Sequence, residues 1–428
     1  MLFSQDLPER AHYDVLVAGG GLAGVAAAVA AARAGKRVLL LEKSQKLGGL
    51  ATLGLINLFV PMCNGRGKQI IFGMTEEFLR LSIRNGYGNV PEDFVNGRIP
   101  EEKLAAYRAA GKLPPRYVAR FSPEIFALEL TALCAREGVD LRFDALLTRA
   151  AVEETGGHKR ILGVVVEEKS GASYYGADMF VDATGDGDLM ARAGLPTAVR
   201  GNFHTYLGLC ITLESCALAA KTGNIGAATG YFSGGEATLY GEKHPEGLPL
   251  YDGTSADEVN RYLVQNQLEM LRKLEGQDRL SRDIVTLPGM CQFRTTRRIE
   301  GDYVLQESDA YRHFDDSIAA ICDFDRRDYL FEVPRRTIVR SGWDNLVTAG
   351  RSAAGEGYAW DVLRVIPPAI LTGQAAGLLC CQALDESRPV ASTDIRVLQA
   401  ELAKQNVLLH FDDADVPEES ASEHEHND

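Results

Sequence analysis

The feature that most constrains this chain is a run of glycines between two apolar segments near the N-terminus. The apolar residues 13–18 predict a buried strand, residues 19–24 a tight turn, residues 26–33 a helix, and residues 37–41 a second strand that ends at Glu42. This order of elements within about 30 residues is typical of a mononucleotide-binding half of a Rossmann-type α/β fold. We therefore expect an α/β protein whose chemistry is organised around that turn.

The glycine turn fits the spacing G-x-G-x-x-G. Gly19 permits the turn, Gly21 lets a pyrophosphate approach the backbone, and Gly24 lets the helix pack closely on the strand. The start of the helix supplies free N–H groups and a partial positive charge for phosphates. The cofactor contacts predicted here are Gly19, Gly21, Leu22, Ala23 and Gly24.

Glu42 stands 18 residues after Gly24, at the end of the second predicted strand. Its carboxylate would accept hydrogen bonds from the hydroxyls of an adenosine ribose and would repel a 2′-phosphate. A second pair of glycines, Gly48 and Gly49, suits another close approach to a pyrophosphate and a ribityl chain. The contacts expected along this segment are Glu42, Lys43, Gly48, Gly49 and Thr52.

On these residues the chain resembles the FAD-dependent oxidoreductases of the glutathione-reductase superfamily. It is more closely similar to the branch with a single nucleotide domain, usually named simply FAD-dependent oxidoreductase, and more distantly to the fumarate reductase and aspartate oxidase flavoproteins. The resemblance spans about residues 12–405 and rests also on VDATGDGD at 181–188, RTTRRIEGDY at 294–303, NLVTAGR at 345–351 and TGQAAG at 372–377. It implies one bound FAD.

The resemblance implies further FAD contacts outside the first strand-turn-helix unit. These are Ala183, Thr184, Gly185, Gly350, Arg351, Ala369 and Ile370. In the wider superfamily an acidic residue often follows the AG pair of the third of those motifs and binds the ribityl chain. Arg351 stands there, so a phosphate contact is expected instead. The helix that begins near Pro367 should direct the N–H groups of Ala369 and Ile370 at flavin N1 and O2.

Two arginines in the RTTRRIEGDY motif are candidates for binding substrate. Arg294 and Arg298 are four residues apart, so they share a face on a strand and also on a helix. We expect them to bind one anionic substrate group together, because guanidinium groups match carboxylates and phosphates. The alternative is structural pairing with Glu300 or Asp302, or with the FAD phosphates.

His204 and Tyr206 are two residues apart, on one face of a predicted strand. A histidine near flavin N5 could act as general base in the dehydrogenation of an alcohol or amine, and the alternative is a hydrogen-bonded structural histidine. Cys63 follows the second glycine pair and could approach the flavin, with a buried, inert thiol as the alternative.

The domain organisation expected is a Rossmann-like FAD-binding domain with a β-meander, interrupted by an α+β substrate domain. The FAD-binding parts are 12–200 and 335–411, the substrate domain is 201–334, and an acidic tail at 412–428 is expected to be disordered and dispensable. The four runs 139–143, 147–153, 160–168 and 173–182 predict a strand followed by the meander.

Composition excludes several classes of protein. The net charge is −14, and the tail at 412–428 has eight acidic residues and no Lys or Arg, which argues against a nucleic-acid partner. The eight cysteines are dispersed and form no C-x-x-C pair, as expected for reduced thiols in a cytoplasmic protein without a metal site. No apolar run is long enough for a membrane span, and the N-terminus lacks the pattern of a signal peptide.

The function expected is hydride transfer between a polar or acidic small molecule and flavin N5, with the electron acceptor or donor left open. A reductase of an unsaturated acid, or a flavin-bound sensor or structural flavoprotein without turnover, are the alternatives. The sequence has no second G-x-G-x-x-G after a strand, which argues against a separate site for NADH or NADPH. It has no C-x₄-C pair after the first glycine turn, which argues against a disulfide reductase. The oligomeric state is left open, a homo-oligomer included.

Overall fold

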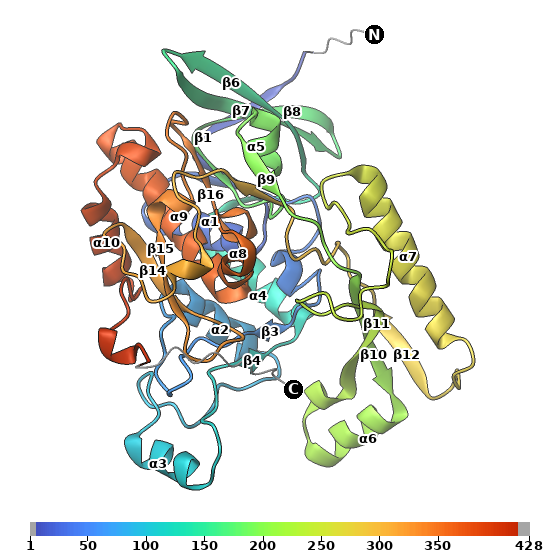
Figure 1. Cartoon of the computed structure of the whole chain (residues 1–428). Coiled ribbons are helices and arrows are strands. Elements are labelled where there is room, and N and C mark those ends of the chain that lie inside the picture. The colour runs from blue at the N-terminus through green and yellow to red at the C-terminus, as the bar shows by residue number, and fades with distance from the viewer. Residues whose placement is uncertain (1–5, 418–428) are drawn as a thin grey trace.

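A mixed seven-stranded sheet forms the centre of the protein, of which a computed structural model describes residues 6–417. The strand order is β5-β2-β1-β8-β7-β6, and β16 also pairs with β8 (Figure 1). The strands are β1 (Glu9–Ala18), β2 (Val38–Leu41), β5 (Asp140–Arg142), β6 (Leu146–Thr155), β7 (His158–Glu168), β8 (Gly171–Asp182) and β16 (Leu346–Thr348). β1, β2, β5, β8 and β16 pair in parallel, and the antiparallel β6, β7 and β8 form the predicted meander. The prediction of a Rossmann-like α/β fold is thus confirmed.

Helix α1 (Leu22–Arg33) lies against α9 (Ile366–Glu386), and two glycines explain how closely they approach. A side chain at Gly373 would place a Cβ atom 2.2 Å from the carbonyl oxygen of Ala23, and one at Gly377 would place it 2.3 Å from that of Ala27. Only glycine fits at such distances. The TGQAAG motif therefore serves helix packing, which brings the start of α9 to the glycine turn.

Local rules account for the other elements of this body. Ser122 caps α4 (Pro123–Arg136) by accepting from the N–H of Ile125, as its position before a proline predicts. α2 (Met74–Arg84) packs on α4 and α9, whereas α3 (Glu101–Ala109) has no buried residue. The remaining short elements are β3 (Leu58–Phe59), β4 (Ala119–Arg120), α5 (Asp188–Ala193), β9 (Thr197–Val199), β13 (Arg297–Ile299) and α8 (Gly357–Leu363).

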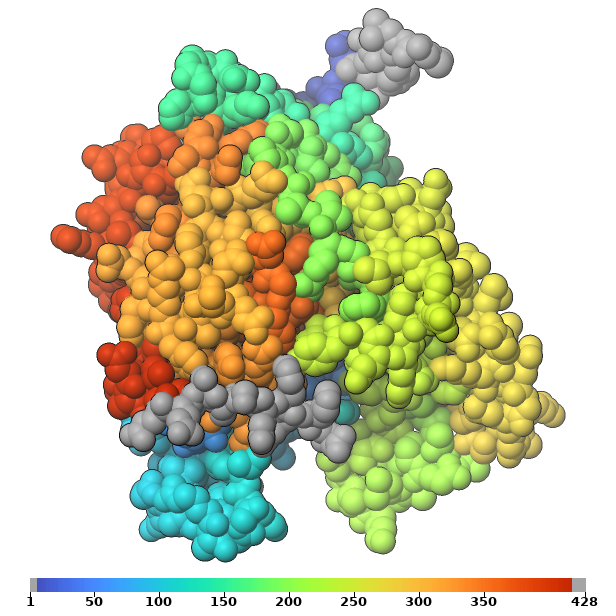
Figure 2. Space-filling view, in the orientation of Figure 1, coloured from blue at the N-terminus to red at the C-terminus, as the bar shows by residue number. Residues whose placement is uncertain are grey.

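A second region is built on a three-stranded sheet of order β11-β10-β12. It comprises β10 (Thr205–Thr212), α6 (Leu213–Thr222), β11 (Thr229–Glu236), α7 (Ala256–Leu274) and β12 (Arg282–Thr286). Its own small core contains Tyr206, Tyr251, Tyr262, Met270 and Phe293. The space-filling view shows that α3 and α6 project as separate lobes at one end of the molecule (Figure 2).

The packing of one hairpin argues for a smaller substrate domain than 201–334. β14 (Ser317–Cys322) and β15 (Leu330–Pro334) pack with α9 and α10 (Ile395–Lys404) and belong to the core of the FAD-binding body. They lie on the opposite side of the molecule from α7 (Figure 1). We therefore propose that the substrate domain ends near Arg297, where β13 pairs with β9 of the body.

The C-terminal segment docks on this body as far as the structure describes it. Phe411 is buried, and Asp413 accepts a hydrogen bond of 2.9 Å from Nε2 of His313. Asp415 pairs with Lys68, and Val416 packs against the core. The expectation of a disordered tail from residue 412 is therefore wrong for 412–417, because an apolar anchor and two ion pairs hold them. Residues 418–428 lie outside the described part.

Within residues 6–417, no single helix is long and apolar enough to cross a membrane. α8 and α9 reach that length and composition only as a pair, which is bent by 76°.

Candidate active site

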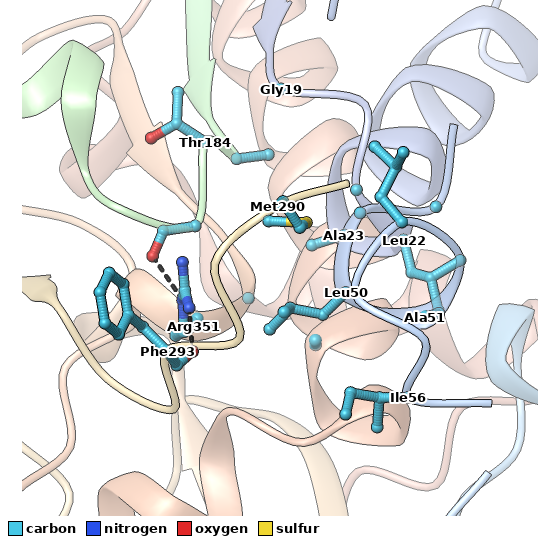
Figure 3. A pocket seen from close by; sticks show the side chains of 18 of the residues that line it. Gly19, Leu22, Ala23, Leu50, Ala51, Ile56, Thr184, Met290, Phe293 and Arg351 are labelled. Atoms are coloured by element: carbon cyan, nitrogen blue, oxygen red, sulfur yellow. Dashed lines mark hydrogen bonds between the residues drawn. The ribbon is translucent and has the colours of Figure 1, made fainter. Parts of the chain in front are cut away.

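A cavity of about 670 Å³ lies between the glycine turn and the second region. The carboxyl ends of β1, β2, β8 and β16 open into it, and β10 and the segment 289–294 form another wall. Figure 3 shows Leu22 and Ala51 along one side, with Phe293 and Arg351 along the other. Such a position, outside the carboxyl ends of parallel strands, is where open α/β sheets bind ligands.

The glycine turn has the close contacts that its spacing predicts. Gly19 has φ +101°, and a Cβ there would lie 2.4 Å from the carbonyl oxygen of Ala183. A Cβ at Gly24 would lie 1.9 Å from the carbonyl oxygen of Gly19, so Gly24 serves packing and does not line the cavity. A Cβ at Gly21 would meet no atom within 4 Å, although Gly21 lines the cavity. The room beside Gly21 is therefore room for a ligand.

The first turn of α1 is free to bind an anion. Gly21 is the N-cap of α1 and has no side chain that could accept from the helix N–H groups. Leu22 and Ala23 line the cavity beside it. Uncapped N–H groups at a helix N-terminus suit phosphate oxygens, so this turn fits the diphosphate of a dinucleotide.

Glu42 lies at the end of β2, where the ribose contact is expected. Its carboxylate accepts 2.7 Å hydrogen bonds from the N–H groups of Gly20 and Ser44, and it lines the cavity. Lys43 also lines the cavity, 4.0 Å from the carboxylate of Asp186. Glu42 thus fixes the glycine turn and remains beside the space for an adenosine.

The second glycine pair forms another wall of the cavity. Gly48 has φ +108° and Gly49 has φ +55°, and a Cβ on Gly49 would lie 3.1 Å from the Cα atom of Gly21. Thr52 does not line the cavity, contrary to expectation. Its hydroxyl donates to the carbonyl of Leu47 at 2.6 Å, so it supports the Gly48 turn from behind.

Arg351 is placed at the cavity but is already fully engaged. Its Nε donates to the carbonyl of Gly185 at 2.8 Å, and its other nitrogens donate to Phe293 and to the carboxylate of Asp186. The expected phosphate contact is therefore not supported. Arg351 instead ties the segment before Arg294 to the end of β8. Ala183, Thr184, Gly185 and Gly350 all line the cavity as expected.

The start of α9 also faces the cavity, one residue earlier than predicted. The helix begins at Ile366, so the N–H of Ala369 already donates to the carbonyl of Val365 and is not free. Ala369 still lines the cavity, whereas Ile370 is fully buried in the core and does not. Since Pro367 and Pro368 carry no N–H, Ile366 is the first-turn residue of α9 whose N–H can face a ligand.

The structure replaces the expected arginine pair with a different one. Arg294 and Arg364 both line the cavity, whereas Arg298 does not. Arg294 donates to the carbonyls of Thr238 and Ala237 at 2.9 and 3.1 Å, and Arg364 is held by Asp361 at 2.7 Å. Burial, and then the charge of Arg364, lower the pKa of Arg294 to about 10, so Arg294 stays cationic at neutral pH.

Arg298 lies outside the cavity because the backbone changes between the two arginines. Regular strand geometry begins only at Arg297, so the shared face expected for residues four apart does not exist. Arg298 is buried on β13, where its guanidinium donates to the carbonyl of Ile299 and lies 5.8 Å from the ring of Trp360.

His204 and Tyr206 also lie outside the cavity. Their neighbours Thr205 and Leu207 line it, and successive side chains of a strand point to opposite faces. His204 bonds through Nδ1 to the hydroxyl of Tyr251 at 2.9 Å, and burial lowers its pKa. Tyr206 is fully buried in the core of the second region. Both belong to the packing beneath the cavity wall.

Cys63 has the features of an inert thiol. It is fully buried, does not line the cavity, and accepts from the N–H of Tyr117 at 3.0 Å. Burial raises its pKa. The alternative of a buried, inert thiol therefore fits Cys63.

Sequence reasoning missed most of the apolar wall of the cavity. The residues that share this wall come from six separate segments: Leu50, Ile56, Leu58, Val60, Leu207, Leu239, Met290, Phe293, Phe324, Val365 and Ile366. Single apolar residues so far apart carry no motif. The one available indication was the position of Met290 and Phe293 directly before Arg294.

A dinucleotide turn, an acidic residue after the next strand, and a cavity at the carboxyl ends of parallel strands are typical of a dinucleotide-binding fold. The model of the FAD-dependent oxidoreductase family matches residues 14–216 and 250–402, and the chain belongs to this family. The protein is therefore an FAD-dependent oxidoreductase, an enzyme with FAD as its cofactor.

Individual relatives are more distant. A soluble pyridine nucleotide transhydrogenase of Marinomonas sp. (strain MWYL1) is 56% identical over 46 residues, which are 10% of this chain and 10% of that protein. A flavoprotein/dehydrogenase of Cytophaga hutchinsonii is 14% identical with a TM-score of 0.46, over 92% of this chain and 86% of that one. A geranylgeranyl bacteriochlorophyll reductase-like protein of Thermoplasma acidophilum is 15% identical with a TM-score of 0.42, over 92% and 84%.

Proposed function

We propose that this enzyme oxidises a small anionic amine, such as an amino acid, by hydride transfer from carbon to flavin N5. The observation that carries the proposal is the pair Arg294 and Arg364 in the wall of an otherwise apolar part of the cavity. FAD supplies the electron-accepting ring when bound. The residues of the chain bind and orient the substrate beside it.

The charges around this pair favour an anionic substrate. Asp361 accepts from Arg364 and also from Arg200, so one carboxylate compensates two guanidinium groups. Arg294 is half-buried beside these groups and, within residues 6–417, forms no ion pair. Desolvating a cation that has no ion pair is costly, and a substrate carboxylate would offset that cost. Two guanidinium groups can hold it in one orientation.

The FAD would lie along the cavity with its adenosine at Glu42 and Lys43. The uncapped turn of α1 at Leu22 and Ala23 would bind the diphosphate, and the apolar wall near Ile366 would surround the flavin ring. These residues fit the group because the space beside Gly21 is open and no side chain caps the first-turn N–H groups of α1.

The polar lining favours an amine over an alcohol. Within the described residues, no histidine lines the cavity, and its only two carboxylates, Glu42 and Asp188, lie at the nucleotide end. Dehydrogenation of an alcohol needs a base for the hydroxyl proton. An amine that reacts in its neutral form can lose hydride from carbon without proton abstraction, since its lone pair stabilises the product. His204, expected as the base, has no part in this proposal.

Anaerobic reduction of the bound flavin tests the proposal. We expect amino acids or N-alkyl amino acids to bleach the flavin absorption, and their amides, which lack the carboxylate, to fail. Reduction by hydroxy acids but not by amino acids would overturn the choice of amine. Reduction by no donor would favour a sensor or structural flavoprotein.

A reductase of an unsaturated acid is the second candidate, because the same two arginines would bind its carboxylate. Reoxidation of the chemically reduced protein by unsaturated acids, without reduction by any amine, would favour it.

The family position within the glutathione-reductase-like superfamily, with a distant relation to fumarate reductases, is also part of the proposal and is supported by the glycine turn and Glu42. A cytoplasmic location is proposed because all eight cysteines are free thiols.

A further inference from the structure

Three potential metal ligands meet on the side of the body away from the second region. His313 precedes β14, Glu332 lies on β15, and His410 follows α10. Nδ1 of His313 is 2.5 Å from one carboxylate oxygen of Glu332, and Nδ1 of His410 is 3.0 Å from the other. All three donor groups lie within 4.8 Å of one another. None of the three lines the FAD cavity.

The buried position of Glu332 is unusual for a carboxylate. β15 is buried along its whole length, and the side chain of Glu332 is 0% exposed. The N–H of Phe314 donates to it at 2.7 Å, and the two imidazoles provide its other contacts. A buried carboxylate of this kind needs a compensating charge, which a cation between it and the imidazoles would supply.

His313 is oriented as a metal-binding histidine usually is. Nδ1 faces Glu332, and Nε2 is 2.9 Å from the carboxylate of Asp413. The ring of Phe411 lies 4.4 Å from the imidazole ring and holds it from one side. A carboxylate that accepts a hydrogen bond from Nε2 fixes the orientation and the tautomer of the ring, and it makes Nδ1 a better metal ligand.

We propose that His313, Glu332 and His410 bind one divalent transition-metal ion, and that zinc is the preferred ion. Two imidazole nitrogens and one carboxylate oxygen suit zinc and argue against magnesium or calcium, which take oxygen ligands. The histidine side chains are 42% and 46% exposed, so an ion can enter and water can complete its coordination. The ion links the C-terminal segment to the β14–β15 hairpin and stabilises that junction.

The test uses the full-length, FAD-loaded protein without an affinity tag, stripped of metal by a chelator. His424 and His426, outside the described residues, could bind zinc adventitiously, so both are replaced by Asn in every protein compared. Zn²⁺ is titrated in competition with a chromophoric chelator, and the melting temperature is measured with and without Zn²⁺. We expect one Zn²⁺ per chain and a higher melting temperature with it.

The variants separate a metal site from a hydrogen-bonded cluster. His313→Asn and His410→Asn should each weaken zinc binding by more than about tenfold, and Asp413→Asn by about tenfold through loss of orientation. His158→Asn is the matched control, since His158 pairs with one carboxylate, that of Asp344, on the exposed surface. It should bind zinc as the parent does. Absence of stoichiometric binding in the parent, or equal binding in His410→Asn and the parent, would overturn the proposal.

Discussion

The carboxylate of Glu42 accepts a hydrogen bond of 2.7 Å from the backbone N–H of Gly20, inside the glycine turn. One side chain therefore both shapes the turn and faces the space expected for the adenosine ribose. A change at Glu42 should affect the cofactor through both contacts.

We predict that Glu42→Gln weakens FAD binding by more than about tenfold. A hydrogen bond to a charged group contributes about 1.5 to 3 kcal/mol, and the amide can accept only part of the bonds that the carboxylate accepts. FAD affinity would be measured by fluorescence titration of the apoprotein. Glu154→Gln, on an exposed part of the meander, is the control. An affinity equal to wild type in Glu42→Gln would remove the ribose assignment.

Two glycine substitutions should have opposite consequences. Gly21→Ala places a methyl group where no protein atom lies within 4 Å, so the apoprotein should keep its stability but bind FAD more weakly. Gly24→Ala places one 1.9 Å from the carbonyl oxygen of Gly19, so the turn itself must shift and the apoprotein should lose stability. Thermal melting of both apoproteins, with FAD titration, checks this. A destabilised Gly21→Ala apoprotein would contradict the open space beside Gly21.

Arg294 and Arg364 should act together on an anionic ligand. Arg294→Gln and Arg364→Gln should each raise the dissociation constant of a carboxylate ligand at least about tenfold, and the double variant should lose less than the sum, since both contact one group. Binding is read from the perturbation of the flavin spectrum by a series of small carboxylates.

Arg298→Gln discriminates between the two arginine pairs. Arg298 does not line the cavity, so this variant should bind the same carboxylates as wild type does, at equal FAD content. Weak binding in Arg298→Gln but not in Arg364→Gln would restore the pair expected from sequence.

Truncation after His410 should lower the melting temperature. It removes the buried Phe411 and the contacts of Asp413 and Asp415, and burial of a phenylalanine alone contributes about 1.5 to 3 kcal/mol. Truncation after Pro417 keeps these contacts and is the matched control. Calorimetry of the two truncated proteins compares them, and equal melting temperatures would show that the segment contributes nothing.

NADH and NADPH should be poor direct reductants of the flavin. The chain has one G-x-G-x-x-G turn after a strand, and the cavity at that turn is the one assigned to FAD. Stopped-flow mixing under anaerobic conditions measures the rate of bleaching. Rapid stoichiometric bleaching by either nucleotide would show that a second dinucleotide site exists without that motif.

The sequence alone determined the features that depend on neighbouring residues. The strand-turn-helix unit at 13–33, the place of Glu42, the meander and the Ser122 cap of α4 were all predicted, because short-range sterics and local hydrogen bonds specify them. FAD as the cofactor followed from the family resemblance that the motifs carry. Even here the start of α9 was misplaced by one residue, since two adjacent prolines conceal where a helix begins.

Only the tertiary structure decided which distant side chains share a site. Arg364 is 70 residues beyond Arg294 in sequence, and only the folded chain brings the junction of α8 and α9 and the segment 289–294 to one cavity. Similarly, the face that β10 and the residue before it turn to the cavity excludes His204 and Tyr206. The docking of residues 410–417 brings His410 to Glu332 and Asp413 to His313. The pattern of side chains along one helix or strand indicates which residues share a face. The packing of all the elements decides whether that face lies against the core, the cavity or the solvent.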